Sequence, residues 1–383
     1  MRPPPPAEPI GMPIDEIDTP VLLVDLDDLE FNINKLSTHF SQAGKHLRPH
    51  TKSHKTPAIA HLQLQAGAIG VTCAKLGEAE VMADAGIDDI LIANEVVGRH
   101  KIPRLMELAR RCDIMVAVDD PDNLADLDTA AAAVGVQPRM LVELNIGHDR
   151  CGVPFESDAV VDLCRAVHNA DNLRFAGIMG YQGHVVDLPD ADERETGARQ
   201  CLDRLSTAVA NVRAAGLQVD IVSTSATGDY YVSTTYDAVT EVQAGSYALM
   251  DAAYGALDLG FRHALTVLTT VTSRPTPEQV ITDAGLKTLT PEHGFPLVKL
   301  PSREGIEVGW DPQGLRFLEC HALSEEHGRL RAVDGDCHLQ PGELIEFIPG
   351  HGCTTMNLHD QIYAVRDGRL EAIWPIAARG KVR

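Results

Sequence analysis

Hydrophobic and polar positions follow one repeated pattern from about residue 46 to residue 250. Short apolar runs that are typical of buried strands are followed by longer stretches with helical periodicity, such as 75–87 and 194–217, which both stop at a glycine. The helical stretches are too long for hairpin loops, so we expect parallel strands joined by helical crossovers. The eight apolar runs are 46–50, 69–75, 89–93, 113–118, 139–146, 174–182, 221–227 and 241–248.

Eight strand–helix units close most naturally into a (β/α)8 barrel. An open, doubly wound α/β sheet is the competing architecture, but no G-x-G-x-x-G motif follows the first strand. The pattern therefore predicts a barrel, with its functional residues at the carboxyl ends of the strands.

The pattern changes beyond residue 260, where short alternating strands and glycine turns replace the helical periodicity. This pattern predicts an antiparallel β domain. We expect the segment 19–36 to add one strand to it. We expect an N-terminal arm and strand over 1–26, the barrel over 27–260 and the β domain over 261–383. The clearest strand patterns of the last part are 264–274, 279–286, 343–350 and 360–366.

The amino-acid composition and net charge argue against some classes of binding partner. The chain has 383 residues, 44% hydrophobic and 23% charged, as in an ordinary globular protein. Its 33 basic and 55 acidic residues give a net charge of −22, which argues against nucleic acid or an anionic membrane as a partner. The proline-rich start (MRPPPPAEPIGMP) predicts an extended arm, with a disordered tail without function as the favoured alternative, and holds no apolar run of signal-peptide or membrane-span length. Eight scattered cysteines without a C-x-x-C pair predict a reduced, cytoplasmic protein.

The stretch 48–55 (RPHTKSHK) is the first candidate for chemistry. It places two lysines and two histidines at the end of the first barrel strand. If the strand continues, Lys52 projects into the barrel mouth, where neighbouring cations favour the deprotonated amine that Schiff-base chemistry needs. Lys55 lies beyond, in a position where we expect a solvated role. The alternative for the whole stretch is a solvated basic loop.

Other strand ends carry weaker signals. Arg150, in the turn after the fifth strand, could place its guanidinium against a phenolate or carboxylate, or simply lie on the surface. Small hydroxyl residues and glycines at 223–228 and 243–247 end the last two strands, where barrels often bind phosphate, although such clusters are also ordinary turns.

A metal pair is a further candidate. His351 and Cys353 lie two residues apart in the segment 349–355. In an extended segment this spacing puts both side chains on one face, able to share a divalent cation with open positions left for water or substrate. A buried pair at a strand end is the alternative.

Taken together, these features resemble the fold-type III pyridoxal-phosphate enzymes, whose barrel is of the alanine racemase N-terminal type. Within them the chain is similar to the group of D-threonine aldolase, 3-hydroxy-D-aspartate aldolase and D-serine dehydratase. The similarity covers nearly the whole chain and rests on the motifs RPHTKSHK, GVTCAKLGEAEV, ANEVVG, DRCGV, QAGSYALMD, DAGLK and NLHD.

The resemblance implies a role for each candidate residue. Lys52 would form the Schiff base with pyridoxal 5'-phosphate, and Arg150 would hold the cofactor's 3'-oxygen. Gln243 would face the pyridine nitrogen, and Tyr181 would lie near the ring or the substrate and join Lys52 and His351 as a catalytic residue. The phosphate would be held by Thr227, Gly228, Gly245 and Ser246. The divalent metal would be bound by His351 and Cys353.

The resemblance also implies a reaction, namely retro-aldol cleavage of a D-3-hydroxy amino acid to glycine and an aldehyde. Lys52, a histidine such as His184, or a metal-bound hydroxide would take the hydroxyl proton. The alternative is a D-serine or D-threo-3-hydroxyaspartate dehydratase, which forms a 2-oxo acid and ammonia. Cys353 favours this alternative and a softer cation such as Zn²⁺ over Mn²⁺ or Mg²⁺, whereas the motif set favours the aldolase. The family further implies a homodimer.

Overall fold

The computed structural model describes residues 9–299, 318–333, 337 and 339–383, so most of the proline-rich arm lies outside the described residues. The chain forms two compact units. One unit comprises Met1–Asn32 and Ala248–Ile376, and the other comprises Ile33–Tyr247 and Ala377–Arg383. The C-terminal residues thus belong with the barrel unit, where Ala378 N donates a hydrogen bond to Lys55 O at 3.0 Å.

The barrel unit contains all eight predicted strands, and every pairing between them is parallel. The sheet closes because the segment 46–50 is bonded on both sides. His50 N donates to Ala244 O at 3.1 Å, and Ile69 N donates to Leu47 O at 3.0 Å. The predicted barrel is confirmed. In order around the sheet its strands are β2 (His46–Leu47), β3 (Val71–Cys73), β4 (Asp89–Glu95), β5 (Asp113–Val118), β6 (Arg139–Asn145), β8 (Arg174–Gly180), β9 (Ile221–Thr224) and β10 (Glu241–Val242).

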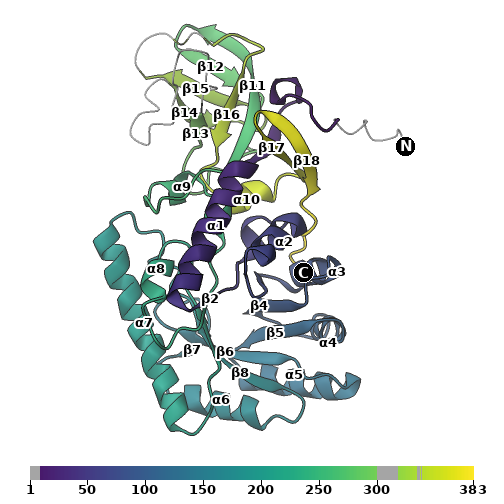
Figure 1. The fold of residues 1–383 in the computed structure, drawn as a ribbon, viewed down its shortest axis with the longest axis vertical. Coiled ribbons are helices and arrows are strands. Elements are labelled where there is room, and N and C mark those ends of the chain that lie inside the picture. The colour runs from purple at the N-terminus through teal and green to yellow at the C-terminus, as the bar shows by residue number, and fades with distance from the viewer. Residues whose placement is uncertain (1–8, 300–317, 334–336, 338) are drawn as a thin grey trace. The chain divides into compact units, whose positions relative to one another are not determined.

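Helices cover the outer face of this sheet (Figure 1). Local sequence determines where they begin and end, as α5 illustrates. The Asp120 side chain accepts a hydrogen bond from Asn123 N, Pro121 occupies the first turn, and Gly135 ends the helix with a positive φ. The connecting helices are α2 (Pro57–Gln65), α3 (Leu76–Asp84), α4 (Ile102–Ala109), α5 (Pro121–Val134), α6 (Ala159–Asn169), α7 (Ala191–Ala214) and the short α8 (Tyr230–Ser233).

Alternate residues of the strands β4, β5, β6 and β8 contribute to two separate cores. One set fills the barrel interior and includes Leu91, Met115 and Leu141. Their neighbours in sequence, such as Ile92 and Val142, face the opposite way and pack with the helices. Burial on both faces explains why the strands are apolar at nearly every position rather than alternating.

The second unit is a nine-stranded sheet, as predicted for the C-terminal part. The N-terminal strand β1 (Val21–Asp25) joins it, antiparallel to β11 and parallel to β17, the one parallel pairing in the described part of this sheet. The other strands are β11 (Leu265–Thr276), β12 (Gln279–Thr282), β13 (Leu297–Lys299), β14 (Leu318–Leu323), β15 (Gly328–Ala332), β16 (Leu344–Ile348), β17 (Gln361–Arg366) and β18 (Arg369–Pro375). Its helices are α9 (Ala252–Gly255) and α10 (Gly352–Met356). The helix α1 (Leu26–Ala43) begins in this unit, and its residues from Ile33 onward belong to the barrel unit. Among the described residues, no helix has the length and apolar character needed to span a membrane.

Candidate active site

Lys52 lies in a single 3-10 turn, Thr51–Ser53, and not on a continuing strand as the alternation of residues predicted. The chain turns directly after His50, whose Nδ1 accepts a hydrogen bond from Lys52 N at 3.4 Å. The lysine side chain is half-buried, and its Nζ lies 5.8 Å from the ring centroid of Tyr181. The turn therefore directs Lys52 towards the end of strand β8, after which Tyr181 follows.

Arg150 meets the same ring. Its guanidinium carbon lies 5.1 Å from the Tyr181 centroid, within the range of a cation–π contact. Three of the predicted site residues, which come from the ends of β2, β6 and β8, are thus brought together around one tyrosine. This clustering at the carboxyl ends of the strands is where a barrel of this type holds its active site.

The other cations of the stretch 48–55 are not available to this site. Arg48 is buried and forms ion pairs with Glu241 at 3.0 Å and Asp89 at 2.7 Å. Lys55, for which the sequence predicted a solvated role, is instead buried and paired with Glu78. That prediction is wrong because the turn after His50 directs Lys55 back into the barrel wall.

The two predicted phosphate segments are linked to each other, because Thr227 Oγ1 accepts a hydrogen bond from Tyr247 N at 3.0 Å. A side chain at Gly228 would collide with the carbonyl of Val186, and one at Gly245 would lie 2.6 Å from His50 O. Both glycines are therefore required for close backbone approach. Ser246 begins the 3-10 turn Ser246–Ala248 and is half-buried.

Gln243, the predicted partner of the pyridine nitrogen, directly follows the last strand, β10, and is buried. Its Nε2 donates a hydrogen bond to Ser223 Oγ at 2.8 Å. A neighbouring network is built on the buried Asp229, which accepts from Gln182 Nε2 at 2.6 Å and from Ala226 N at 3.0 Å. Burial raises the pKa of Asp229 to about 6.

Two histidines that border the Tyr181 ring complete this part of the site. His148 lies edge-on to Tyr181 with 5.6 Å between centroids, and it stacks on His184 at 5.7 Å. Burial, followed by the charge of Arg150, lowers the pKa of His148. His184 was predicted from the sequence as a possible base, whereas His148, which directly precedes the DRCGV motif, was not predicted.

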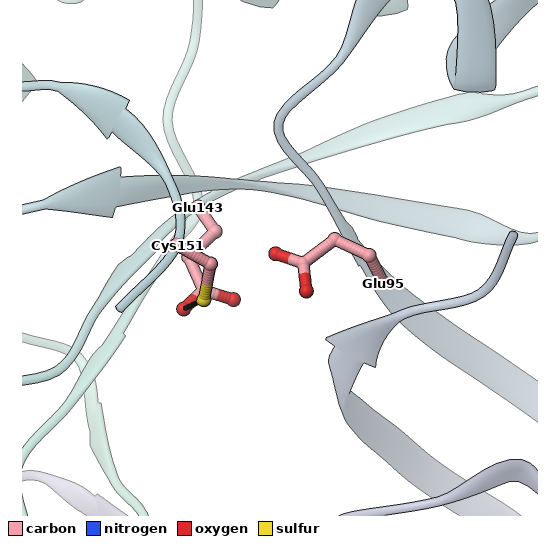
Figure 2. Close-up of side chains that lie close together, drawn as sticks. All are labelled: Glu95, Glu143 and Cys151. Atoms are coloured by element: carbon pink, nitrogen blue, oxygen red, sulfur yellow. Dashed lines mark hydrogen bonds between the residues drawn. The ribbon is translucent and has the colours of Figure 1, made fainter. Parts of the chain in front are cut away.

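A cluster next to Arg150 was likewise not predicted from the sequence. Glu95, Glu143 and Cys151 each place a potential ligand atom within 4.8 Å of the other two (Figure 2). Glu143 Oε1 lies 3.3 Å from Arg150 Nη2 and accepts from Cys151 Sγ at 3.0 Å. Nothing in the local sequence marks Glu95 or Glu143, since the two belong to different strands.

In the β unit, His351 and Cys353 interact, but not in the way the spacing predicted. His351 is extended, whereas Cys353 lies inside helix α10, so the segment is not continuously extended. The buried Asp251 carboxylate lies 3.0 Å from His351 Nδ1 and also accepts from Gly352 N at 2.8 Å. Burial lowers the pKa of His351, but Asp251 and Cys353 outweigh it and raise the pKa to about 10.

The comparisons with known proteins agree with this geometry. A family model described as "Alanine racemase, N-terminal domain" matches residues 24–253, and one described as "Putative serine dehydratase domain" matches residues 264–365. The fold and the residues around Tyr181 thus define an enzyme with an alanine racemase-type barrel.

Relatives make the assignment more specific. The chain is 38% identical to D-threonine aldolase of Arthrobacter sp., over 98% of this chain and 96% of the relative. It is 37% identical to 3-hydroxy-D-aspartate aldolase of Paracoccus denitrificans, over 97% and 94%. The crystal structure of D-threonine aldolase from Filomicrobium marinum has a TM-score of 0.91 and 40% identity, and the match covers 98% of this chain and 99% of that one.

The chain therefore belongs to the family that contains D-threonine aldolase and 3-hydroxy-D-aspartate aldolase, and the predicted family and enzyme class are confirmed. A dehydratase relative is more distant: D-threo-3-hydroxyaspartate dehydratase of Delftia sp. is 27% identical over 88% of this chain and 92% of the relative.

Proposed function

We propose that this protein is a pyridoxal-phosphate- and divalent-metal-dependent lyase that cleaves D-3-hydroxy amino acids to glycine and an aldehyde. The observation that carries the proposal is the meeting of Lys52 and Arg150 on the ring of Tyr181 at the strand ends. The aldolase relatives, which are more similar to this chain than the dehydratase relative, support the direction of the reaction.

The residues present suit the cofactor. Lys52 would hold the aldehyde carbon and Arg150 the 3'-oxygen, with Tyr181 beside the ring and Gln243 at the pyridine nitrogen. At the far end, the backbone N–H groups of the buried Gly228 and Gly245 make no hydrogen bond within the described part of the chain. Buried N–H groups without an acceptor suit an anion such as phosphate. When bound, pyridoxal phosphate accepts the electron pair released from Cα.

The metal pair also suits its proposed ligand. Asp251 contacts His351 Nδ1, which leaves Nε2 as the ring nitrogen for a metal, the usual carboxylate–histidine arrangement. His351 and Cys353 would hold the cation, which would polarise the substrate's β-hydroxyl. The thiolate favours Zn²⁺, whereas a carboxylate at that position would favour Mn²⁺ or Mg²⁺.

Proton movement falls to side chains near Tyr181. Cleavage requires that the β-hydroxyl lose a proton and that Cα gain one. Lys52 can deliver the proton to Cα, because its Nζ and the Arg150 guanidinium both lie against the Tyr181 ring, beside which the cofactor would be bound. His148 has a lowered pKa and is therefore neutral at physiological pH, so it can accept a proton, as can its stacking partner His184.

Dehydration of the same substrates is the second candidate. Cys353 favours it, since a thiol at this position is more typical of the dehydratases in the resemblance given above. Loss of the β-hydroxyl would give a 2-oxo acid and ammonia in place of glycine and an aldehyde.

Product analysis separates the two reactions. The enzyme is incubated with D-threonine and with D-serine, with and without a chelator. We expect glycine and acetaldehyde from D-threonine, and loss of activity on chelation that added Zn²⁺ or Mn²⁺ restores. Formation of 2-oxobutyrate or pyruvate would overturn the aldolase assignment, and full activity after complete metal removal would remove His351 and Cys353 from the reaction.

The preferred substrate within the D-3-hydroxy amino acids, the homodimer and the cytoplasmic location remain predictions. Sedimentation of the purified protein tests the homodimer directly.

A further inference from the structure

Two carboxyl groups face each other inside the barrel, at the carboxyl ends of its strands. Glu143 lies two residues beyond Leu141, on the strand face that points into the barrel, and Glu95 ends strand β4. Figure 2 shows the Glu95 carboxyl group directed at Glu143, with Cys151 beside Glu143. Because β4 and β6 are alternate strands, their inward side chains share one layer of the barrel.

The hydrogen bonds of this pair are incomplete as long as both groups are ionised. Glu143 Oε1 accepts from Arg150 and Cys151, but its Oε2 and the Oε1 of Glu95 are buried without a donor among the described residues. Glu143 is buried and Glu95 is half-buried, and two carboxylates this close in such a setting repel each other, so one of them takes up a proton. A proton between the two groups supplies the missing donor and leaves one negative charge opposite one arginine.

A cation in place of the proton agrees less well with the surroundings. The third potential ligand, Cys151, is a thiol that donates to Glu143, and burial together with Glu143 raises its pKa to about 12. A metal would also be placed close to the guanidinium of Arg150, which lies 3.3 Å from Glu143. Both features favour a proton.

We propose that Glu95 and Glu143 share a single proton and that this unit, with one negative charge, positions Arg150 for the cofactor's 3'-oxygen. The proposal rests on the function proposed above. Glu143 is 2% exposed, whereas the Arg150 side chain is 46% exposed, so the contact with Glu143 ties an exposed guanidinium to a buried group. Glu143 is thus a positioning residue for Arg150. The proton that Glu143 shares with Glu95 limits the pair to one negative charge.

The charges around the pair determine how it responds to pH. Burial, the charge of Glu143 and the charge of Asp119 raise the pKa of Glu95 to about 7. Above that pH the pair carries two negative charges. The second charge draws Arg150 back towards the pair and repels the anionic 3'-oxygen, so cofactor affinity falls.

Two measurements test the proposal. The first is infrared difference spectroscopy at pH 6 on the purified protein without added cofactor. Asp229, whose pKa is about 6, contributes a protonated carboxyl band that the wild type and Glu95→Gln share. We expect the wild type to show a further protonated carboxyl band that is absent from Glu95→Gln. Identical carboxyl bands in the two proteins overturn the shared proton. Glu107→Gln, at an exposed position of α4, is the matched control and leaves the band in place.

The second measurement is the dissociation constant of pyridoxal phosphate, determined by titration of the cofactor-free protein between pH 5.5 and 9. We expect Glu143→Gln to weaken binding about tenfold at every pH, because Arg150 loses its charged partner. We expect Glu95→Gln to bind like the wild type below pH 6.5 but to lose the decline above pH 7. A decline of equal size in the wild type, Glu95→Gln and Glu107→Gln would overturn the role in positioning Arg150.

The two measurements also separate this proposal from the proposed function. If the wild type shows the infrared band but binds no pyridoxal phosphate, the proposed function fails and the Arg150 role fails with it, while the shared proton stands. If the wild type binds the cofactor and cleaves D-threonine but the band is missing, only the shared proton is overturned.

Discussion

At the scale of single residues, burial separates chemical groups that the sequence presents as equivalent. Lys52 and Lys55 lie three residues apart in one basic stretch, yet only Lys52 reaches the ring of Tyr181. Lys55 is paired with Glu78, whose side chain is 2% exposed. One lysine is therefore available for chemistry, and the other neutralises a charge that the barrel has buried.

This contrast predicts opposite outcomes for two substitutions. Lys52→Ala abolishes the absorbance of the cofactor–lysine Schiff base but leaves the free energy of unfolding nearly unchanged. Lys55→Met lowers the free energy of unfolding by about 3–5 kcal/mol, because Glu78 is left buried without a partner. Absorbance spectra and urea unfolding of both variants check the prediction. Undiminished Schiff-base absorbance in Lys52→Ala would show that Lys52 is not the lysine that forms the Schiff base.

At the scale of elements, the metal pair depends on how helix α10 begins. Asp251 accepts from Gly352 N and contacts His351 Nδ1, so one carboxylate holds both the start of the helix and the orientation of the imidazole. It also accepts from Tyr254 N at the start of α9. The geometry of the site is thus set by a residue that would not touch the metal.

We expect Asp251→Asn to weaken metal binding about 10–100-fold, since loss of the carboxylate behind a ligating histidine has effects of that size. Titration of the metal-free protein with Zn²⁺ gives the affinity. Asp258→Asn, at an exposed position of the same segment, serves as the control. Equal affinities in the two variants would mean that Asp251 does not orient a ligand.

At the scale of the whole molecule, 55 acidic residues against 33 basic ones make stability depend on pH through many groups at once. The contribution of a single carboxyl group to this pH dependence is therefore resolved only by comparing two proteins that differ in that group. Glu95, with a pKa raised from 4.5 to about 7, is the group to isolate.

The sign of its contribution follows from proton binding. Between about pH 4.5 and pH 7 the folded protein holds the Glu95 proton and the unfolded chain does not, so the free energy of unfolding falls as pH rises. Relative to Glu95→Gln, we expect the wild type to lose stability across this window and to level off above it. Urea unfolding of both proteins at several pH values gives the difference between their free energies of unfolding. This difference would not change between pH 4.5 and pH 7 if the pKa of Glu95 were at its ordinary value.

The sequence by itself determined the architecture. Eight apolar runs joined by helix-length segments specify a parallel barrel, because strand and helix periodicities are local properties of the chain. Lys52 and Arg150 were candidates from the sequence pattern, since active-site residues of a barrel follow its strands and so lie at predictable places, whereas Tyr181 was named from the family resemblance.

Only the tertiary structure decided what these residues face. The turn at Thr51–Ser53, the helix that contains Cys353 and the burial of Lys55 all differ from the sequence prediction, because each depends on backbone packing against distant segments. The Glu95–Glu143 pair and the contact of Asp251 with His351 join residues 48 and 100 positions apart. No local pattern encodes such a pair, since its charge state and geometry arise only when the closed barrel or the folded β unit brings the two groups together and limits their contact with water.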